Sequence, residues 1–296
     1  MDGVLIIDKP AGPTSHDVVT AARRILGAAR VGHTGTLDPT ATGVLPLVIG
    51  RATRLARFLT AAEKEYVARV QFGWATDTYD AAGRPAPGVA AELRPVTREA
   101  LEEALAGFRG LLLQQPPPYS AKKIGGVRAY DLARRQTPVE PRAVPVTVHA
   151  LELRAFDGCT AELRVVSSAG FYVRTLAHDL GRRLGVGGHL AALRRTRSGD
   201  FEEIAAVPLE ALGSPAAAAG FILLDRLLPN VPAAVVRAPG LRKVEHGQDL
   251  DPGDLVRWPA LPWPPLIRLL DEAGHLIAVA EPRSDSRFLH PSVVLK

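Results

Sequence analysis

The fold of this sequence is decided by residues 32–43, which read Gly32-His33-Thr34-Gly35-Thr36-Leu37-Asp38-Pro39-Thr40-Ala41-Thr42-Gly43. The glycine, threonine and proline content of this stretch predicts a loop. An aspartate that precedes a proline, as Asp38 does, is commonly a turn former, because its side chain bonds the local backbone. The glycines would also suit a phosphate-binding loop, but the Gly-Lys-Ser/Thr ending of nucleotide-hydrolysing loops is missing. The loop alone therefore leaves Asp38 open to a structural or a chemical role.

Apolar patterns on both sides of the loop predict a mixture of strands and helices. The expected strands are Val4–Ile7, Val44–Ile49, Tyr66–Phe72, Val144–Leu153 and Thr160–Ser167. The expected helices are one capped by Thr14 or Ser15 that runs to about Leu26, then Arg51–Thr60, a helix capped by Thr97, a basic helix over Arg128–Arg135, and Tyr172–Leu184. Because strands and helices mix without strict alternation, we expect an α+β fold.

A change in composition near Leu228-Pro229-Asn230 predicts a boundary between residues 1–229 and residues 230–296. The second part holds two short strand-like pieces, Leu266–Leu270 and Leu276–Ala280, which a turn at Gly274 joins. These pieces predict a small all-β appendage.

Composition excludes several classes of protein. With 47% hydrophobic and 23% charged residues among 296, the chain is typical of a soluble globular protein. Its single cysteine, Cys159, cannot form an internal disulfide, and no Cys/His pattern suggests a zinc site, so we expect a cytoplasmic protein without a metal. Neither a signal peptide nor a membrane-spanning segment is expected, since the longest uncharged stretch, Ala211–Leu224, is too short to cross a bilayer.

Positive charge is concentrated in the first part of the chain. The net charge is +5, and residues 230–296 contribute none of it, because their basic and acidic residues balance. The cations gather in residues 20–60, 119–143 and 174–197, and most of them are arginines. Arginine-rich clusters suit a polyanion such as RNA, although solvated helix faces would explain them equally well.

The loop resembles the hallmark G-H-T-G-x-L-D-P-x-A-x-G of the TruB family of tRNA pseudouridine synthases, which this chain matches from Gly32 to Gly43. Further matches to that family follow in the same order along the chain: Leu5–Pro10 with Gly12 and Thr14-Ser15, Lys64-Glu65-Tyr66, Thr76-Asp77-Thr78 with Asp80 and Gly83, Pro117–Lys123 with Gly126 and Tyr130, Gly170–Leu176 with Asp179-Leu180-Gly181, and Leu193–Thr196.

The resemblance implies a pseudouridine synthase catalytic domain with a mixed, largely antiparallel sheet flanked by helices. It also implies an RNA-binding insertion at residues 114–142, whose proline-rich start and cations fit contacts to the RNA backbone. Residues 230–296 resemble a PUA domain, a small β module that binds RNA. That match is weaker, resting on Glu245-His246-Gly247 and the Leu266–Ala280 hairpin.

The implied activity is the isomerisation of uridine to pseudouridine in the T loop of tRNA, at position 55 of tRNA numbering. This reaction needs no oxidant, metal or cofactor, but it needs a group that acts as nucleophile or base. The family pattern assigns that role to Asp38, by covalent attack or by proton abstraction, and the sequence leaves both routes open. Because burial disfavours a carboxylate, a cation must lie beside it, and Arg174 at a helix start is the family's candidate.

The remaining expected site residues contact the substrate. Tyr66 would stack on the target base and is also the family's candidate for moving a proton. Tyr172 and Leu193 match positions that line the pocket, although each suits an ordinary core as well. The base must leave its stack to react, and His33 would fill the gap or merely shape the turn. Lys9 would contact a phosphate or organise the neighbouring loop.

We therefore expect a monomeric enzyme that binds the T arm of tRNA and flips out its target base, with no obligatory protein partner. One alternative is a guide-RNA-dependent pseudouridine synthase, which needs partner proteins; the basic residues at 119–143 argue against it. A second is a catalytically silent protein that binds or folds RNA, against which the joint presence of Asp38, Tyr66 and Arg174 argues.

Overall fold

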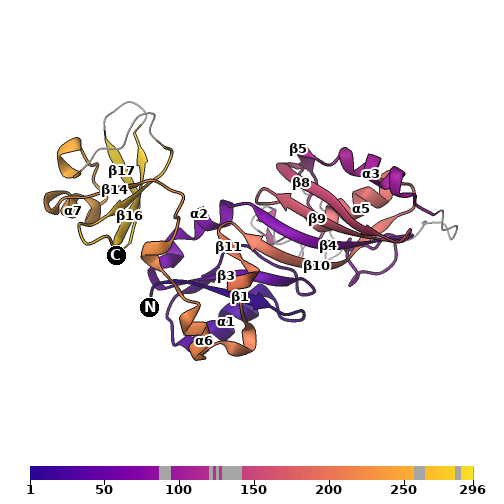
Figure 1. The fold of residues 1–296 in the computed structure, drawn as a ribbon, viewed down its shortest axis with the longest axis horizontal. Coiled ribbons are helices and arrows are strands. Elements are labelled where there is room, and N and C mark those ends of the chain that lie inside the picture. The colour runs from indigo at the N-terminus through magenta and orange to yellow at the C-terminus, as the bar shows by residue number, and fades with distance from the viewer. Residues whose placement is uncertain are drawn as a thin grey trace.

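The computed structural model describes residues 1–86, 95–119, 123–124, 127–128, 142–256, 264–283 and 288–295. Its described strands form one large mixed sheet, a separate sheet of β14 to β17 near the C-terminus, and a short hairpin. Figure 1 shows an elongated molecule with the small C-terminal sheet at one end and the large sheet curving through the rest. None of the helices in the described ranges is long and apolar enough to span a bilayer.

The N-terminal half of the large sheet is built on β1 (Gly3–Lys9) and β3 (Thr42–Ile49), which are antiparallel, with β2 (Val31–His33) on the far edge of β3. Helix α1 (Ser15–Leu26) packs Val18, Val19 and Ala22 against these strands. It begins where Thr14 and Asp17 cap each other's backbone N–H groups. After α1 ends, the chain returns to the sheet as the edge strand β2.

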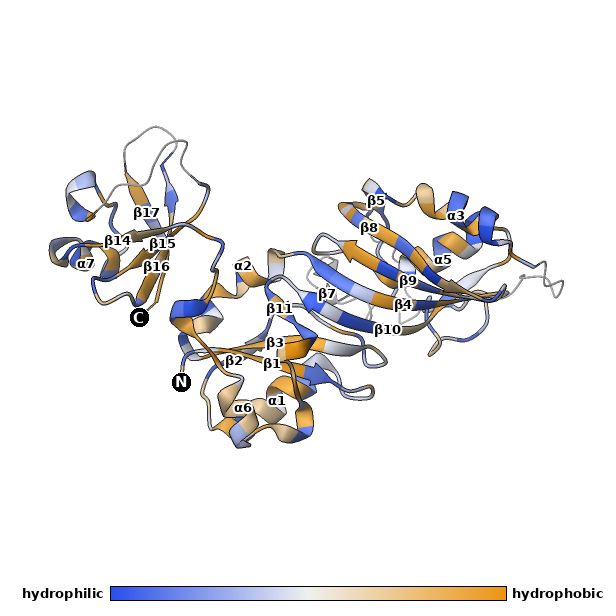
Figure 2. Ribbon diagram, viewed as in Figure 1, coloured by the Kyte–Doolittle hydropathy of each residue, from blue (hydrophilic) through white to orange (hydrophobic). Residues whose placement is uncertain are grey.

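The other half runs in the order β10 (Gly188–Ser198), β4 (Lys64–Phe72), β9 (Thr160–Ser167), β8 (Val144–Phe156) and β5 (Gly110–Gln114), with every neighbouring pair antiparallel. Helices α3 (Arg98–Ala106) and α5 (Val173–Arg183) contribute to its core. Figure 2 shows hydrophilic and hydrophobic residues mixed along β4, which is buried at every second position.

The two halves meet at a short parallel pairing between β3 and β10, where Thr42 lies opposite Arg194 and Gly43 opposite Arg195. The predicted loop of residues 32–43 ends at this seam. It is not wholly irregular, as its first residues belong to β2 and its last to β3. The seam therefore places the Asp38 loop between the two half-sheets.

Short elements complete the part of the chain that precedes the C-terminal sheet. They are η1 (Gly50–Leu55), α2 (Ala56–Ala61), β6 (Lys123–Ile124), β7 (Val127–Arg128), β11 (Phe201–Glu202), η2 (Glu203–Ala205), β12 (Val207–Pro208), η3 (Leu209–Ala211), α6 (Pro215–Ala219), β13 (Ile222–Leu223) and η4 (Leu224–Arg226). The helix expected over Arg51–Thr60 is thus a 3-10 turn followed by a short α-helix.

Most of the basic insertion, residues 120–122, 125–126 and 129–141, lies outside the described residues. So does nearly all of the basic helix expected over Arg128–Arg135. Its first residue, Arg128, belongs instead to the two-residue strand β7, which pairs with β6. The prediction of a helix that starts at Arg128 is therefore wrong at that residue, because backbone pairing with β6 extends the chain there.

The C-terminal sheet consists of β14 (Ala233–Val235), β15 (Ile267–Leu270), β16 (Leu276–Pro282) and β17 (Leu289–Val294). The expected all-β character is wrong, since α7 (Ala238–Glu245) buries Val244 in the core of this sheet, and η5 (Pro252–Asp254) follows. The two expected strands of the hairpin are present as β15 and β16.

The small sheet packs on the preceding part of the chain through a shared apolar cluster. Leu276, Val279 and Leu295 from the C-terminal part join Leu55 and Leu59 in it. Around the cluster, cations of residues 50–57 reach across: the Arg51 guanidinium donates to the Leu295 carbonyl, and that of Arg57 to Glu281 and Ser292. The α+β fold with a mixed, largely antiparallel sheet is confirmed.

Candidate active site

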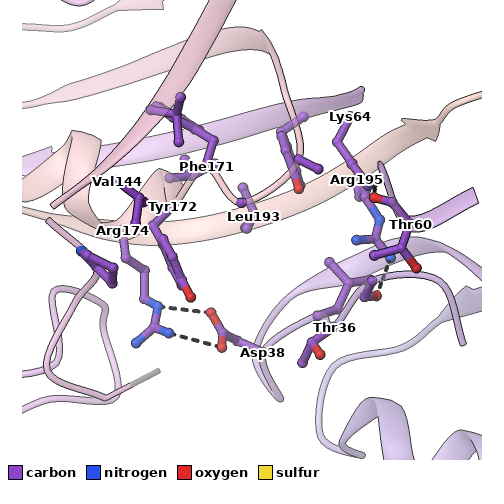
Figure 3. Close-up of a pocket in the computed structure, with 18 of the residues that line it drawn as sticks. Thr36, Asp38, Thr60, Lys64, Val144, Phe171, Tyr172, Arg174, Leu193 and Arg195 are labelled. Carbon is purple, nitrogen blue, oxygen red and sulfur yellow. Dashed lines mark hydrogen bonds and ion pairs between the residues drawn. The ribbon is translucent and has the colours of Figure 1, made fainter. Parts of the chain in front are cut away.

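A cavity of about 580 Å³ opens at the seam between the two half-sheets. Its walls come from the Asp38 loop, β4, β10, the first strand residues of β8 and the segment that leads into α5. In Figure 3, Asp38 and Arg174 face each other at one side of this cavity, while Lys64, Thr60 and Arg195 lie at the other side. The cavity therefore gathers residues that lie far apart in the sequence.

Asp38 and Arg174 form a two-pronged ion pair. The Nε atom of Arg174 lies 2.9 Å from Oδ2 of Asp38, and its Nη2 atom lies 3.1 Å from Oδ1. The Arg174 side chain is only 7% exposed, whereas 36% of the Asp38 side chain remains open to the cleft. This fork-to-carboxylate geometry fixes the orientation of the carboxylate while leaving one side of it accessible.

Arg174 is itself held from several directions. Its guanidinium donates to the carbonyls of Tyr119 (2.8 Å) and Thr78 (3.3 Å), and its Nη1 atom lies 3.8 Å from Oδ2 of Asp80. Asp80 is in turn fixed by the Thr78 hydroxyl and by the Ala82 N–H. One buried cation thus serves two carboxylates, of which only Asp38 lines the larger cavity.

Opposing influences set the protonation of Asp38. Burial raises the pKa of its carboxyl above the usual value, the Arg174 charge lowers it, and the nearby negative charge of Asp80 raises it again. The net result is a raised pKa. Arg174 therefore keeps the carboxylate accessible in its ionised form, against a protein environment that favours the acid.

The Asp38 loop is tied to the first helix and to the segment that precedes it. The Ser15 hydroxyl donates to the Leu37 carbonyl and accepts from the Leu37 N–H, at 3.0 and 2.8 Å. On the other side of Asp38, the Gly12 N–H donates to the Pro39 carbonyl. Both neighbours of Asp38 are therefore anchored through the backbone, which limits how far the carboxylate can move.

The Lys9 side chain holds this loop in place through hydrogen bonds. Its ammonium is fully buried and donates to the carbonyls of Pro10, Pro39 and Ala41, at 2.8, 3.1 and 2.7 Å. Because an ammonium has three protons, none remains for a phosphate. Of the two roles expected from the sequence, the structure supports loop organisation and does not support substrate contact.

Tyr66, Tyr172 and Leu193 all line the cavity with Asp38 and Arg174. His33 does not line it: it belongs to β2, and its Nδ1 atom is buried without a hydrogen-bond partner. Burial lowers the pKa of the His33 imidazole, so that the ring is neutral at pH 7. The structure thus brings together every expected site residue except His33 and Lys9, which do not line the cavity. His33 lies at the start of the Asp38 loop, and Lys9 donates to carbonyls of that loop.

Arg195 is a site residue that sequence reasoning missed. It is 1% exposed, lines the cavity, and donates to the carbonyls of Val44 (2.7 Å) and Gly35 (3.0 Å). Burial lowers the pKa of Arg195, and its interaction with the nearby Tyr66 hydroxyl offsets part of that effect. The signal was present in the Leu193–Thr196 block but could not be interpreted without β10.

Lys64 stands beside Arg195. Its ammonium donates to the carbonyls of Thr60 and Ala62. Burial and the neighbouring Arg195 charge lower its pKa to about 8. No carboxylate of the described residues pairs with either cation, so the wall opposite Asp38 is electropositive.

Much of the positive charge seen in the sequence is neutralised within the protein. Arg194 pairs with Asp8 and Glu203, and Arg197 pairs with Glu63 at 2.6 Å. Arg51 pairs with Asp2. These paired cations add little to the attraction of a polyanion. The clusters of basic residues in the sequence therefore contain fewer free cations than their number indicates.

Comparisons with known proteins agree with this fold. The family model of the N-terminal domain of TruB family pseudouridylate synthases matches residues 23–173, and that of the C-terminal domain of tRNA pseudouridylate synthase B matches residues 174–235. The tRNA pseudouridine synthase B of Solibacter usitatus is 46% identical over the full length of both chains. That of Azoarcus sp. is 48% identical over 84% of this chain and 86% of its own.

Two solved structures share the fold. The Cbf5 structure in a Cbf5-Nop10-Gar1 complex has a TM-score of 0.77 and 26% identity, and that in an archaeal box H/ACA sRNP Nop10-Cbf5 complex has 0.74 and 27%. Each covers 99% of this chain and about 85% of the other. The fold is therefore shared with proteins solved in complex with partners, whereas the similarity in sequence is greater to the bacterial synthases. The chain belongs to the TruB family of pseudouridylate synthases.

Proposed function

We propose that this protein isomerises uridine to pseudouridine in tRNA, that its target is uridine 55 of the T loop, and that Asp38 is the reacting carboxylate. The observation that carries the proposal is the ion pair between Asp38 and Arg174, which presents an oriented, partly accessible carboxylate to a cavity. The whole-length similarity to tRNA pseudouridine synthase B supports the choice of substrate.

The reaction breaks the bond between uracil N1 and ribose C1′ and makes a bond between C5 and C1′. The proton that C5 loses is balanced by the proton that N1 gains. Asp38 would act either by attacking a carbon of the nucleoside or by removing a proton. Both routes require the ionised carboxylate, and Arg174 supplies the charge that keeps it ionised.

Tyr66 would contact the target base from the cavity wall. Its hydroxyl lies close enough to the Arg195 cation for the two groups to interact. That arrangement suits a group that stacks on uracil and moves a proton between ring positions. Tyr172 and Leu193, on the same cavity, would complete the pocket for the base.

The target base must leave its stack to reach Asp38, which costs a few kcal/mol and is repaid by contacts in the pocket. His33 lies at the start of the Asp38 loop, and its imidazole is neutral. It either fills the gap that the base leaves in the RNA or shapes the turn that carries Asp38. Its orphaned Nδ1 atom is compatible with both roles.

We propose further that the protein acts as a cytoplasmic monomer without obligatory protein partners or a cofactor. Residues 1–229 would form the catalytic domain and residues 230–296 a PUA-like RNA-binding domain. The separate apolar core around Val236, Ile267 and Leu289 supports such a division.

The test is release of tritium from tRNA transcripts labelled at uracil C5, because C5 loses its hydrogen only when it becomes the glycosidic carbon. We expect purified protein alone to release tritium from the wild-type transcript, and to release none from a transcript with cytidine at position 55. Binding without release would support a silent RNA-binding protein. Release only with a guide RNA and partner proteins would support the guide-dependent alternative.

A further inference from the structure

A pair of stacked rings braces the loop that supports Arg174. The rings of Tyr79 and His178 have centroids 3.8 Å apart and planes within 14° of parallel. His178 lies on α5 four residues after Arg174, and residues at this spacing share one helix face. Helix α5 therefore contacts residues 78–80 at two successive turns, through the Arg174 guanidinium and through the His178 ring.

Tyr79 has a strained backbone. Its φ angle is +66°, and among the described non-glycine residues only Leu228 shares a positive value. The left-handed conformation is unfavourable for a bulky residue, so the surrounding contacts must impose it. Such strain persists where a backbone direction serves a function.

Tyr79 lies between two residues, Thr78 and Asp80, that both contact Arg174. The Thr78 carbonyl before it accepts from Arg174, and the Asp80 carboxylate after it lies 3.8 Å from the same guanidinium. The Thr78 hydroxyl also donates to Asp80 across Tyr79, at 2.6 Å. The left-handed turn at Tyr79 thus directs both neighbours toward Arg174.

The backbone of this turn is fixed to β10, while its side chain is fixed to α5. The Leu190 N–H donates to the Tyr79 carbonyl, and the Ala81 N–H donates to the Leu190 carbonyl. On α5, the Nδ1 atom of His178 is buried without a hydrogen-bond partner. The imidazole therefore offers Tyr79 its flat face rather than a hydrogen bond from that atom.

We propose that Tyr79 and His178 are positioning residues for the reaction. Their stack holds the Thr78–Asp80 turn in its strained conformation and thereby keeps the Arg174 guanidinium in its ion pair with Asp38. The inference rests on the proposed function, because its effect is read through turnover. It concerns residues that line neither of the two cavities bordered by Asp38.

The test compares His178→Ala with His178→Phe, which keeps an aromatic ring, and adds Tyr79→Gly. Tyr79→Gly removes the stack and the backbone strain together, so that the left-handed turn no longer needs the stack. Because an aromatic pair contributes roughly 0.5–1.5 kcal/mol beyond its buried area, we expect kcat for tritium release to fall about threefold to tenfold in His178→Ala and to fall less in Tyr79→Gly. KM for tRNA should stay unchanged, His178→Phe should recover most of kcat, and Tyr79→Gly should unfold at the wild-type temperature or above.

A double-mutant cycle gives a second readout. Since the stack acts through the turn that holds Asp80, the kcat loss of His178→Ala combined with Asp80→Asn should be smaller than the product of the two single losses. The inference is overturned if His178→Ala retains the wild-type kcat, if His178→Phe loses as much as His178→Ala, or if kcat merely follows the unfolding temperature. A wild-type protein that releases no tritium from tRNA would instead contradict the proposed function.

Discussion

The Asp38 carboxylate lies where burial and charge oppose each other. Burial favours its protonated form, and the Arg174 guanidinium, held by Tyr119, Thr78 and Asp80, favours its ionised form. The chemistry of the site therefore depends on a cation that is fixed by the protein rather than by substrate. Substitutions around Asp38 should change the pH at which the site works as well as its rate.

The first prediction concerns this pH dependence. Because the pKa of Asp38 is raised and the proposed reaction needs its ionised form, single-turnover tritium release should fall as pH drops through that raised value. Arg174→Met removes the cation and should shift the acid limb to higher pH. Asp80→Asn removes a negative charge and should shift the limb to lower pH, even if it lowers the plateau. Rate profiles of both variants with coincident acid limbs would contradict this account of Asp38.

The second prediction concerns Lys9. Lys9→Met leaves two carbonyls of the Asp38 loop and that of Pro10 without their buried donor, at a cost of about 1–3 kcal/mol for each group that water cannot reach. We expect a lower free energy of unfolding and a lower kcat. The salt dependence of tRNA affinity should be unchanged, because Lys9 has no proton left for a phosphate. A smaller salt slope in Lys9→Met would show that Lys9 binds RNA.

Among the secondary-structure elements, β10 decides how the site is assembled, and local pattern could not predict it. Its sequence, Gly-His-Leu-Ala-Ala-Leu-Arg-Arg-Thr-Arg-Ser, lacks the apolar alternation that identified β4 and β9. Alternate residues of a strand face opposite sides, and here Arg195 is buried under the cavity while Arg194 pairs with surface carboxylates. A strand that buries an arginine is recognisable only once its partners are known.

Other elements were predictable in proportion to their local signals. Helix α1 follows from its cap and apolar face, and it was expected within a residue of its observed bounds. Helix α7 carries Pro239 and Gly240 in its first turns and gave no helical signal. The contact between Asp38 and Arg174, which joins residues 136 positions apart, followed only from the family resemblance.

The third prediction tests the seam between β3 and β10. Gly43 has a φ of +99°, and a Cβ atom there would lie 2.2 Å from the Arg195 carbonyl oxygen. Gly43→Ala should therefore push the half-sheets apart and lower the free energy of unfolding by at least about 1–3 kcal/mol. Chemical denaturation measures this loss. Gly247→Ala is a matched control for the left-handed backbone, because φ is +67° there and nothing lies within 4 Å of its Cβ position. Equal losses in the two variants would contradict a specific role for close approach at the seam.

At the scale of the whole molecule, the cations divide between internal and external tasks. Those of residues 50–57 help to dock the C-terminal sheet, and those of β10 pair with carboxylates or lie buried. Composition alone could not separate these uses, since an arginine in an ion pair counts the same as one that is free. The number of basic residues therefore overstates how many cations of the described surface are free to attract RNA.

The fourth prediction follows from that division. The logarithm of tRNA affinity should fall linearly with the logarithm of salt concentration, by roughly 0.7–0.9 for each phosphate contacted. Arg194→Gln should leave this slope unchanged, because Asp8 and Glu203 already neutralise Arg194. Arg142→Gln, at an exposed position just before β8, should reduce the slope if the phosphate contacts lie on that side. A reduced slope in Arg194→Gln alone would reverse the assignment of the two cations.

The proposed reaction depends on Asp38 being the group that reacts. The most direct measurement is single-turnover tritium release by Asp38→Asn, with saturating enzyme and C5-labelled tRNA, alongside tRNA binding and the unfolding temperature. We predict no release, near wild-type affinity and an unfolding temperature close to that of the wild type, since Asp80 still balances Arg174. Release by a correctly folded Asp38→Asn protein at a rate near that of the wild type would contradict the central claim.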